Sequence, residues 1–257
     1  MKRWTAFSAG LWALATACSD GAGPGHTVSL SFATRLPAGG LAAAHTYGAP
    51  QSAAIMLAGD TMTDGTNTLV IVSAQMVLRE IELERQEVTD CDDSPGPADC
   101  EDFEIGPVLV ELPLGPGTSE QVTVDLPPGI YNEIEFEIHK VSKDDQDDAA
   151  FRAAHPEFTE KSIRVQGTFN GVPFLYESDL DVEQELDLSP PLVIADSVTA
   201  TNLTVRVGLA TWFRALNGGL VNPDSGNKGG ANESLIKENI KQSVEAFEDR
   251  DDDGSEH

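Results

Sequence analysis

The sequence predicts an all-β protein, an antiparallel β-sandwich with one amphipathic helix near its C-terminus. Short runs rich in β-branched and aromatic residues recur along the chain, and Gly, Pro, Asn and Asp separate them. Sustained helical periodicity is confined to the last part of the chain. The 257 residues are 40% hydrophobic and 23% charged, which is ordinary for a folded protein and excludes wholesale disorder.

The expected strands are short and are bounded by turn residues. They cover residues 27–33, 53–58, 68–73, 76–87, 108–112, 121–126, 131–141, 162–168, 172–177, 184–188 and 202–209. Many short strands without long intervening helices favour a sandwich or barrel over a fold of alternating strands and helices. Between two of them, Asn170-Gly171 predicts a type I′ hairpin turn, in which both central residues have positive φ.

Residues 126–131, Leu-Pro-Pro-Gly-Ile-Tyr, predict a tight turn that leads into a long alternating strand. This Leu-Pro-x-Gly-x-Tyr signature is similar to one in transthyretin-like and other immunoglobulin-like sandwich modules. It also recurs in uncharacterised bacterial lipoproteins, which the chain resembles overall. The resemblance covers roughly the central strands, and it implies a fold only, because the motif carries no catalytic residue.

Two expected strands carry the same acidic pattern. Residues 80–84, Glu-Ile-Glu-Leu-Glu, are echoed by residues 133–137, Glu-Ile-Glu-Phe-Glu. A strand with this alternation turns its apolar residues to the core and three Glu outward. If the two strands pair, like charges lie opposite one another and destabilise the sheet unless a cation bridges them. Further acidic clusters occur at residues 90–102, 144–148 and 179–187, and solvated loops are the alternative explanation for all of them.

Helical segments are few. Residues 148–155 predict a short helical turn that Pro156 ends. After a Gly/Asn/Pro-rich connector at 217–231, Asn232 is the expected N-cap of the C-terminal helix. The apolar stripe of that helix consists of Ile236, Ile240, Val244 and Phe247. We therefore expect a sandwich domain over 27–216, fastened to the connector or helix by Trp212-Phe213, and a segment 232–257 that holds the helix and an acidic tail.

The acidic tail matches the first half of a calcium-binding loop. Asp249, Asp251 and Asp253 alternate before Gly254, as do the first ligands of such a loop, and they follow an amphipathic helix. The sequence ends at His257, before the Glu that would complete the ligand set. Two interpretations follow, a solvated acidic tail or a calcium site with these three Asp as ligands.

The first residues have the organisation of a secretory signal. A basic start, Met1-Lys2-Arg3, precedes an apolar run from Trp4 to Ala17. The sequence Ala-Thr-Ala-Cys at 15–18 resembles a bacterial lipobox, although Ala15 stands where Leu is usual. The resemblance implies a signal peptide at 1–17, lipidation of Cys18 and a flexible tether over 18–26. Plain secretion after the same cleavage is the alternative.

The lipobox resemblance also implies a location. A lipidated Cys18 would hold the protein at the membrane of the bacterial cell envelope. Ser19, rather than Asp, after that cysteine implies sorting to the outer membrane.

The two other cysteines, Cys91 and Cys100, straddle a Pro/Gly turn. Outside the reducing cytoplasm, such a close pair favours a local disulfide. The competing hypothesis, a metal site, lacks both a Cys-x-x-Cys spacing and a neighbouring His.

The net charge of −27 argues against nucleic acid as a partner, because phosphates require cationic side chains. The chain has no Gly-x-Ser-x-Gly, Walker or His-Glu-x-x-His motif, and its five His are scattered as surface or internally satisfied residues.

We expect a non-catalytic binding or structural module of the cell envelope, with calcium as its candidate cation. The alternatives are a carbohydrate- or protein-adhesion module and a secreted hydrolase whose carboxylates or His converge in a pocket. The sequence names no protein or glycan partner.

Overall fold

The structure is a computed structural model that describes residues 26–34, 60–85, 101–103, 106–115, 118–195 and 200–248. These residues form two β-sheets packed on each other, so the predicted all-β sandwich is confirmed. Several predictions of the sequence lie outside the described residues and stay predictions. They are the signal peptide at 1–17, the tether up to residue 25, the lipidation of Cys18, the Cys91–Cys100 disulfide, the strand at 53–58 and the calcium ligands Asp249, Asp251 and Asp253.

The smaller sheet has four strands in the order β12-β11-β1-β6. These are β1 (His26–Thr34), β6 (Thr118–Leu126), β11 (Ala200–Val207) and β12 (Val244–Glu248). Two of its pairings are antiparallel, but β1 and β11 pair in parallel, with Leu30 opposite Leu203. The sheets are thus antiparallel with one exception, which sequence patterning does not reveal because an apolar strand reads the same in either direction.

The larger sheet has eight strands, with β3 at its centre. Its main order is β10-β7-β3-β8-β9, and β2, β4 and β5 also pair with β3. The bounds are β2 (Asp60–Thr63), β3 (Thr68–Arg85), β4 (Glu101–Phe103), β5 (Val108–Glu111), β7 (Gly129–Ile138), β8 (Ile163–Phe169), β9 (Val172–Ser178) and β10 (Val182–Ile194). The sequence predicted two strands where β3 runs unbroken for 18 residues. Its pairing shifts register between Arg79 and Glu82, and such bulges let one long strand bend and serve both halves of the sheet.

The helical elements are short, and none of those described is long and apolar enough to cross a membrane. They are α1 (Ala149–Ala154), η2 (Pro156–Phe158), α2 (Leu209–Trp212), η3 (Pro223–Gly226) and α3 (Glu233–Lys241). The first two agree with the helical turn expected at 148–155 and with its end at Pro156.

The C-terminal helix is shorter than its apolar stripe predicted. Helix α3 ends at Lys241, and Val244 and Phe247 belong to β12, which pairs with the edge of β11. This segment forms a strand and not a helix because the edge of β11 offers it backbone hydrogen bonds. In the strand, Phe247 is buried under Arg206, whose guanidinium carbon lies 4.2 Å from the ring centroid. Asn232 occupies the N-cap position, but its side chain donates to Ser225 Oγ at 2.8 Å and does not cap the helix.

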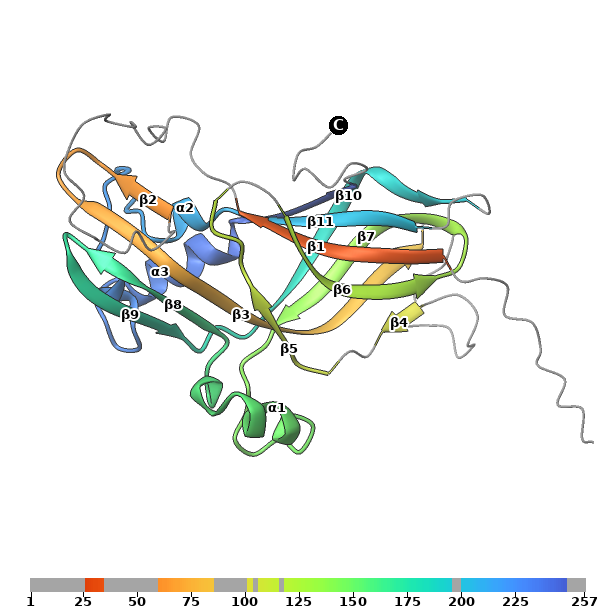
Figure 1. Ribbon diagram of the computed structural model, residues 1–257, viewed down its shortest axis with the longest axis horizontal. Coiled ribbons are helices and arrows are strands. Elements are labelled where there is room, and N and C mark those ends of the chain that lie inside the picture. Colours follow the sequence, from red (N-terminus) through yellow and green to blue (C-terminus); the bar gives the residue numbers. More distant parts are fainter. Residues whose placement is uncertain are drawn as a thin grey trace, which may run out of the picture.

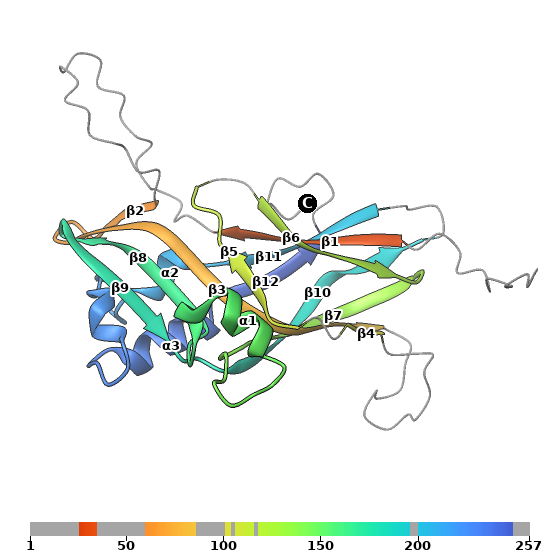
Figure 2. The same cartoon turned by 60° about the horizontal axis from the view of Figure 1, so that its bottom comes forward.

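Two different layers cover the inner face of the larger sheet. The smaller sheet lies over the half that contains β7 and β10, and α2 and α3 lie by the half that contains β8 and β9 (Figure 1, Figure 2). Trp212 Nε1 donates to Ser243 Oγ at 2.7 Å, and the Phe213 ring meets Tyr176 edge-on with centroids 5.3 Å apart. The expected role of Trp212-Phe213 in fastening the helical segment is confirmed.

The two turns predicted from sequence have the expected geometry. In the β8–β9 hairpin, Asn170 and Gly171 have φ values of 53° and 78°, as a type I′ turn requires. Between β6 and β7 the Tyr131 hydroxyl donates to the Pro127 carbonyl at 2.9 Å. Since β6 and β7 belong to different sheets, this bond fixes the point where the chain crosses the sandwich.

Gly167 provides a test of the packing between β3 and β8. A Cβ atom at this buried position would overlap the carbonyl oxygen of Val70 and would lie 2.9 Å from Phe174 Cε1. We expect Gly167→Ala to lower the free energy of unfolding by about 1 to 3 kcal/mol, because the backbone must move to admit a methyl group. Gly106→Ala, where nothing lies within 4 Å of the new methyl, is the control and should change it by less than about 0.5 kcal/mol in urea unfolding. Equal stability of the two variants would contradict the β3–β8 packing.

Candidate functional site

The acidic strand pattern produces two chemically different faces on β7. Ile134, Phe136 and Ile138 point inward and are completely buried. Glu133, Glu135 and Glu137 alternate with them, and all three are partly exposed on the opposite face. The period of two in a β-strand therefore gathers the carboxylates on the outside of the larger sheet.

The strands beside β7 place more carboxylates against these three. Glu82 and Glu84 of β3 lie opposite Glu135 and Glu133. On the other side, β10 pairs with β7 in a register that opposes acidic residues three times, as Glu183 with Glu137, Glu185 with Glu135 and Asp187 with Glu133. We call these eight residues the acidic face. The two echoed Glu strands do pair, and they bring like charges into opposition as the sequence predicted for that case.

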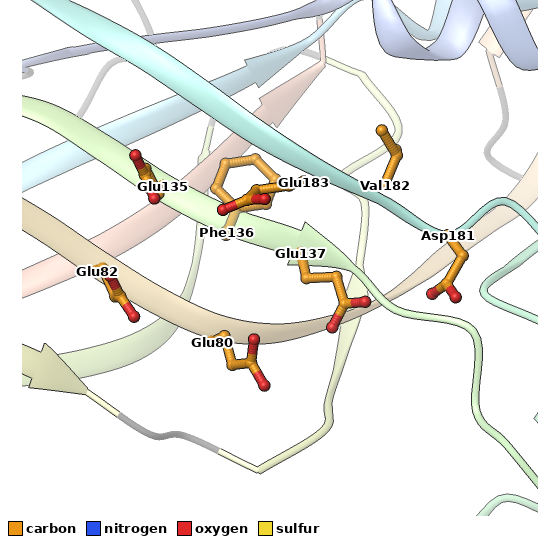
Figure 3. Close-up of a pocket in the computed structure, with 8 residues that line it drawn as sticks. All are labelled: Glu80, Glu82, Glu135, Phe136, Glu137, Asp181, Val182 and Glu183. Atoms are coloured by element: carbon orange, nitrogen blue, oxygen red, sulfur yellow. The ribbon is translucent and has the colours of Figure 1, made fainter. Parts of the chain in front are cut away.

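A groove of about 270 Å³ runs along part of the acidic face. Six of its eight lining residues are acidic, namely Glu80, Glu82, Glu135, Glu137, Asp181 and Glu183, and the other two are Phe136 and Val182. Figure 3 shows that these carboxylates come from β3, β7, β10 and, for Asp181, the residue before β10. Glu80 lies at the bulge in β3 with a φ of 51°, and its carboxylate accepts Arg79 at 2.7 Å. The groove thus presents oxygen ligands almost exclusively.

Glu135 lies in the middle of the acidic face. Oxygens of Glu133, Glu135 and Glu185 lie within 4.8 Å of one another, and we call these three residues the central triad. Burial raises the pKa of Glu135 to about 7, and a hydrogen bond with Glu133 and the negative charges of Glu133, Glu183 and Glu185 add to the rise. At neutral pH the binding of a cation between the strands would therefore favour the carboxylate form of Glu135 and release its proton to water.

A second group lies at the end of β7. Atoms of Glu137, His139 and Asp181 that can bind a metal lie within 4.8 Å of one another, and we call these residues the histidine triad. The His139 side chain is only 7% exposed, and its Nε2 lies 2.8 Å from Oδ1 of Asp148, which is fully buried. His139 Nδ1 lies 3.2 Å from Glu137 Oε2. Burial is also the largest cause of the raised pKa of Glu137; His139 and Arg79 lower this pKa, and Asp181 and Glu80 raise it.

The structure separates acidic residues that sequence reasoning had grouped together. Of the cluster at 179–187, Asp179 binds Lys228 and Lys237 at 2.8 and 2.6 Å and fixes the connector and α3 to the end of β9. The remaining members face β7 or the groove. The cluster at 144–148 contains Asp148, which is buried and faces His139.

His139 and Asp148 were not identified as site residues from the sequence, where His139 was expected to be a surface or satisfied residue. A signal was present, because the alternation of Glu133, Glu135 and Glu137 continues to position 139 on the same face. The partner Asp148 lies beyond a loop, and no spacing rule connects it to that face.

Comparisons of the chain with models of protein families, with curated proteins and with solved structures found no match.

The raised pKa of Glu135 predicts how stability depends on pH in a metal-free protein. Its pKa is about 7 in the folded protein and near 4.5 in a free side chain, so its contribution to stability is complete below about pH 4.5 and is lost as pH rises through 7. In EDTA we expect the melting temperature to fall from about pH 5 to about pH 8, and Glu135→Gln to reduce this fall. Lys228 and Lys237 lower the pKa of Asp179 to about 2, so this carboxylate affects stability only at lower pH, apart from the range in which Glu135 acts.

Glu238→Gln, on the exposed side of α3, is the matched control for that experiment. It removes one carboxylate outside the acidic face and should keep the wild-type pH dependence. If the melting temperatures of Glu135→Gln and Glu238→Gln both depend on pH as the wild type does, the pKa of Glu135 is not raised in the folded protein.

Proposed function

We propose that the protein is a non-catalytic β-sandwich module of the bacterial cell envelope whose acidic face binds calcium. The observation that carries the proposal is the register of β3, β7 and β10, which aligns Glu82, Glu135 and Glu185 across three strands. Each of these pairings costs free energy in the absence of a cation and becomes favourable when a cation lies between the carboxylates.

The spacing of the central triad is compatible with calcium. Calcium binds six to eight oxygens at about 2.3 to 2.6 Å, so oxygens on opposite sides of the ion lie about 5 Å apart. One oxygen each of Glu133, Glu135 and Glu185 lies within 4.8 Å of the other two, and three carboxylates offer up to six oxygens. The face is partly exposed, so water can supply the remaining ligands. The calcium hypothesis thus gains a candidate site within the described residues, separate from Asp249, Asp251 and Asp253.

The hydrolase alternative has one observation in its favour, the convergence of carboxylates and a His in the groove. A raised carboxyl pKa, such as that of Glu135, is also what a general acid needs. However, the one aromatic residue that lines the groove is Phe136, which is fully buried and cannot stack on a sugar. A groove with six acidic lining residues favours a cation over a neutral or anionic substrate.

The envelope location is proposed from the N-terminal sequence. The basic start, the apolar run to Ala17 and the lipobox-like residues before Cys18 support a lipid anchor at the outer membrane, and the observed sandwich agrees with the resemblance to bacterial lipoproteins. The tether at 18–26 would hold the sandwich away from the lipid. Secretion without a lipid is the alternative.

Calcium binding should be measurable as thermal stabilisation. A ligand at one hundred times its dissociation constant adds about 2.7 kcal/mol to the free energy of unfolding, which in a domain of this size is about 5 to 10 °C. We expect millimolar calcium to raise the melting temperature by several degrees and to give a titration heat. Glu135→Gln should remove most of both effects, and the control Glu238→Gln should retain them. An unchanged melting temperature and no heat in the wild type would exclude calcium as the ligand.

The anchor is tested by mass spectrometry of the protein purified from the membrane fraction of a bacterial host. We expect an N-terminal peptide that begins at Cys18 and carries acyl chains, and we expect Cys18→Ala to abolish both the modification and the membrane association. A soluble, unmodified chain that begins at residue 18 would support secretion instead. The same spectra report whether Cys91 and Cys100 are bridged.

A further inference from the structure

We propose that Glu137, His139 and Asp181 form a second cation site, one for a transition-metal ion of the zinc class, in which buried Asp148 positions the histidine. This histidine triad lies one alternation along β7 from the central triad, a step of about 7 Å from Glu135 to Glu137. The site differs from the calcium site in ion, in ligands and in the residues that orient them, and it does not require that calcium binds.

The state of the His139 ring points to a ligand. His139 Nε2 lies 2.8 Å from Asp148 Oδ1, so the ring donates its proton from Nε2 to this carboxylate. His139 Nδ1 is a buried atom with no hydrogen-bond partner, although Glu137 Oε2 lies 3.2 Å away. The buried Nδ1 therefore lies beside a carboxylate oxygen with no hydrogen bond between the two atoms. A metal ion bound to both atoms would give this nitrogen the partner it lacks.

Asp148 is itself held in place. Its second oxygen, Oδ2, accepts the backbone N–H of Ser142 at 2.6 Å, and the residue directly precedes α1. Arg152 of α1 donates to the carbonyl oxygens of Ser142 and of Asp145, which closes the loop around Asp148. A histidine that is oriented through its far nitrogen by a fixed carboxylate is the arrangement that surrounds metal-binding histidines in proteins.

The distances suit a small ion after a modest side-chain movement. Ligands of a tetrahedral zinc ion at about 2.0 to 2.2 Å lie about 3.4 Å from each other. The separation of 3.2 Å between His139 Nδ1 and Glu137 Oε2 already matches that value. Asp181 is exposed, and its Oδ1 accepts the backbone N–H of Lys140 at 2.9 Å. Rotation of its carboxylate can close the remaining gap, and water can complete the coordination.

The ligand set selects the class of ion. One imidazole nitrogen and two carboxylates suit zinc, whereas calcium and magnesium prefer oxygen ligands alone. The charged groups around His139 are Glu137, Asp148 and Asp181, with Glu80 and Asp145 beyond them, against Arg79 and Lys140. Arg79 is bound to Glu80 at 2.7 Å and lies 3.5 Å from Asp145, so the balance at the site stays negative and favours a divalent cation.

The test is zinc titration of the full-length protein in detergent, without reductant, by calorimetry. His139→Gln keeps a side-chain donor for Asp148 but removes the Nδ1 ligand, and Asp181→Asn keeps an acceptor for Lys140 at an exposed position. We expect each to weaken zinc binding at least about tenfold, the range seen when metal-site residues are altered. Glu238→Gln, on the exposed side of α3 and outside the acidic face, is the matched control and should bind zinc as the wild type does.

Asp148→Asn tests the positioning role, with an expected loss of about 10- to 100-fold in zinc affinity. Long-range ¹H–¹⁵N spectra report the protonation of each histidine ring nitrogen. These resonances should not change in Asp148→Asn if Asp148 has only a structural role. On zinc addition the Nδ1 resonance of His139 should shift while Nε2 stays protonated in the wild type. If Asp148→Asn does not fold, the spectra of the wild type and of Asp181→Asn still decide the question.

Two results would overturn the inference. One is zinc affinity that His139→Gln and Asp181→Asn leave unchanged. The other is a His139 ring that stays protonated at both nitrogens in excess zinc, which would make it a cationic bridge between Asp148 and Glu137. Failure here is distinguishable from failure of the calcium proposal, because Glu135→Gln should lose the calcium response and keep zinc binding.

Discussion

The structure depends on the pairing of β3, β7 and β10 in one register. That register buries Ile134, Phe136 and Ile138 completely, and each such side chain contributes about 1.5 to 3 kcal/mol on burial. It also sets Glu135 between two acidic neighbours, at a cost of about 0.2 to 1 kcal/mol for each cross-strand pair. A slip by one residue would relieve the charges but turn the apolar set toward water. Burial therefore wins, and the repulsion stays in the folded protein as a bias toward binding cations.

The layers that pack on the larger sheet decide which of its faces keeps exposed carboxylates. The smaller sheet lies over the inner face of β7 and β10, and α2 and α3 lie by the half of β8 and β9 (Figure 2). Both covers lie on the inner side, and among the described residues no packed layer lies above the carboxylates on the outer face of β7 and β10. Where β7 ends, the loop to α1 returns Asp148 to His139. At this end of β7, the potential ligands include the ring nitrogen of His139 as well as carboxylate oxygens.

The two triads show how one alternating strand can present two different sets of candidate ligands. Glu133 and Glu135 belong to one triad and Glu137 and His139 to the other, all four on the same side of the chain. Their difference lies in what surrounds them. Glu135 is ringed by carboxylates, each of which raises its pKa, whereas His139 is held by a single buried carboxylate that directs its free nitrogen toward Glu137. Charge density favours calcium in the first case, and ligand type favours zinc in the second.

Most of the longer strands, the Asn170-Gly171 hairpin, the turn before Tyr131 and the acidic outer face could be predicted from sequence patterns, because each follows from local geometry or a period of two. These patterns failed where long-range pairing decides the structure. The edge of β11 made a strand of the segment that holds Val244 and Phe247, and β1 found a parallel partner in β11. Only the tertiary structure brought Asp148 to His139 and β10 beside β7. Those contacts join residues that loops separate, and no spacing in the chain encodes which loops return to the same face.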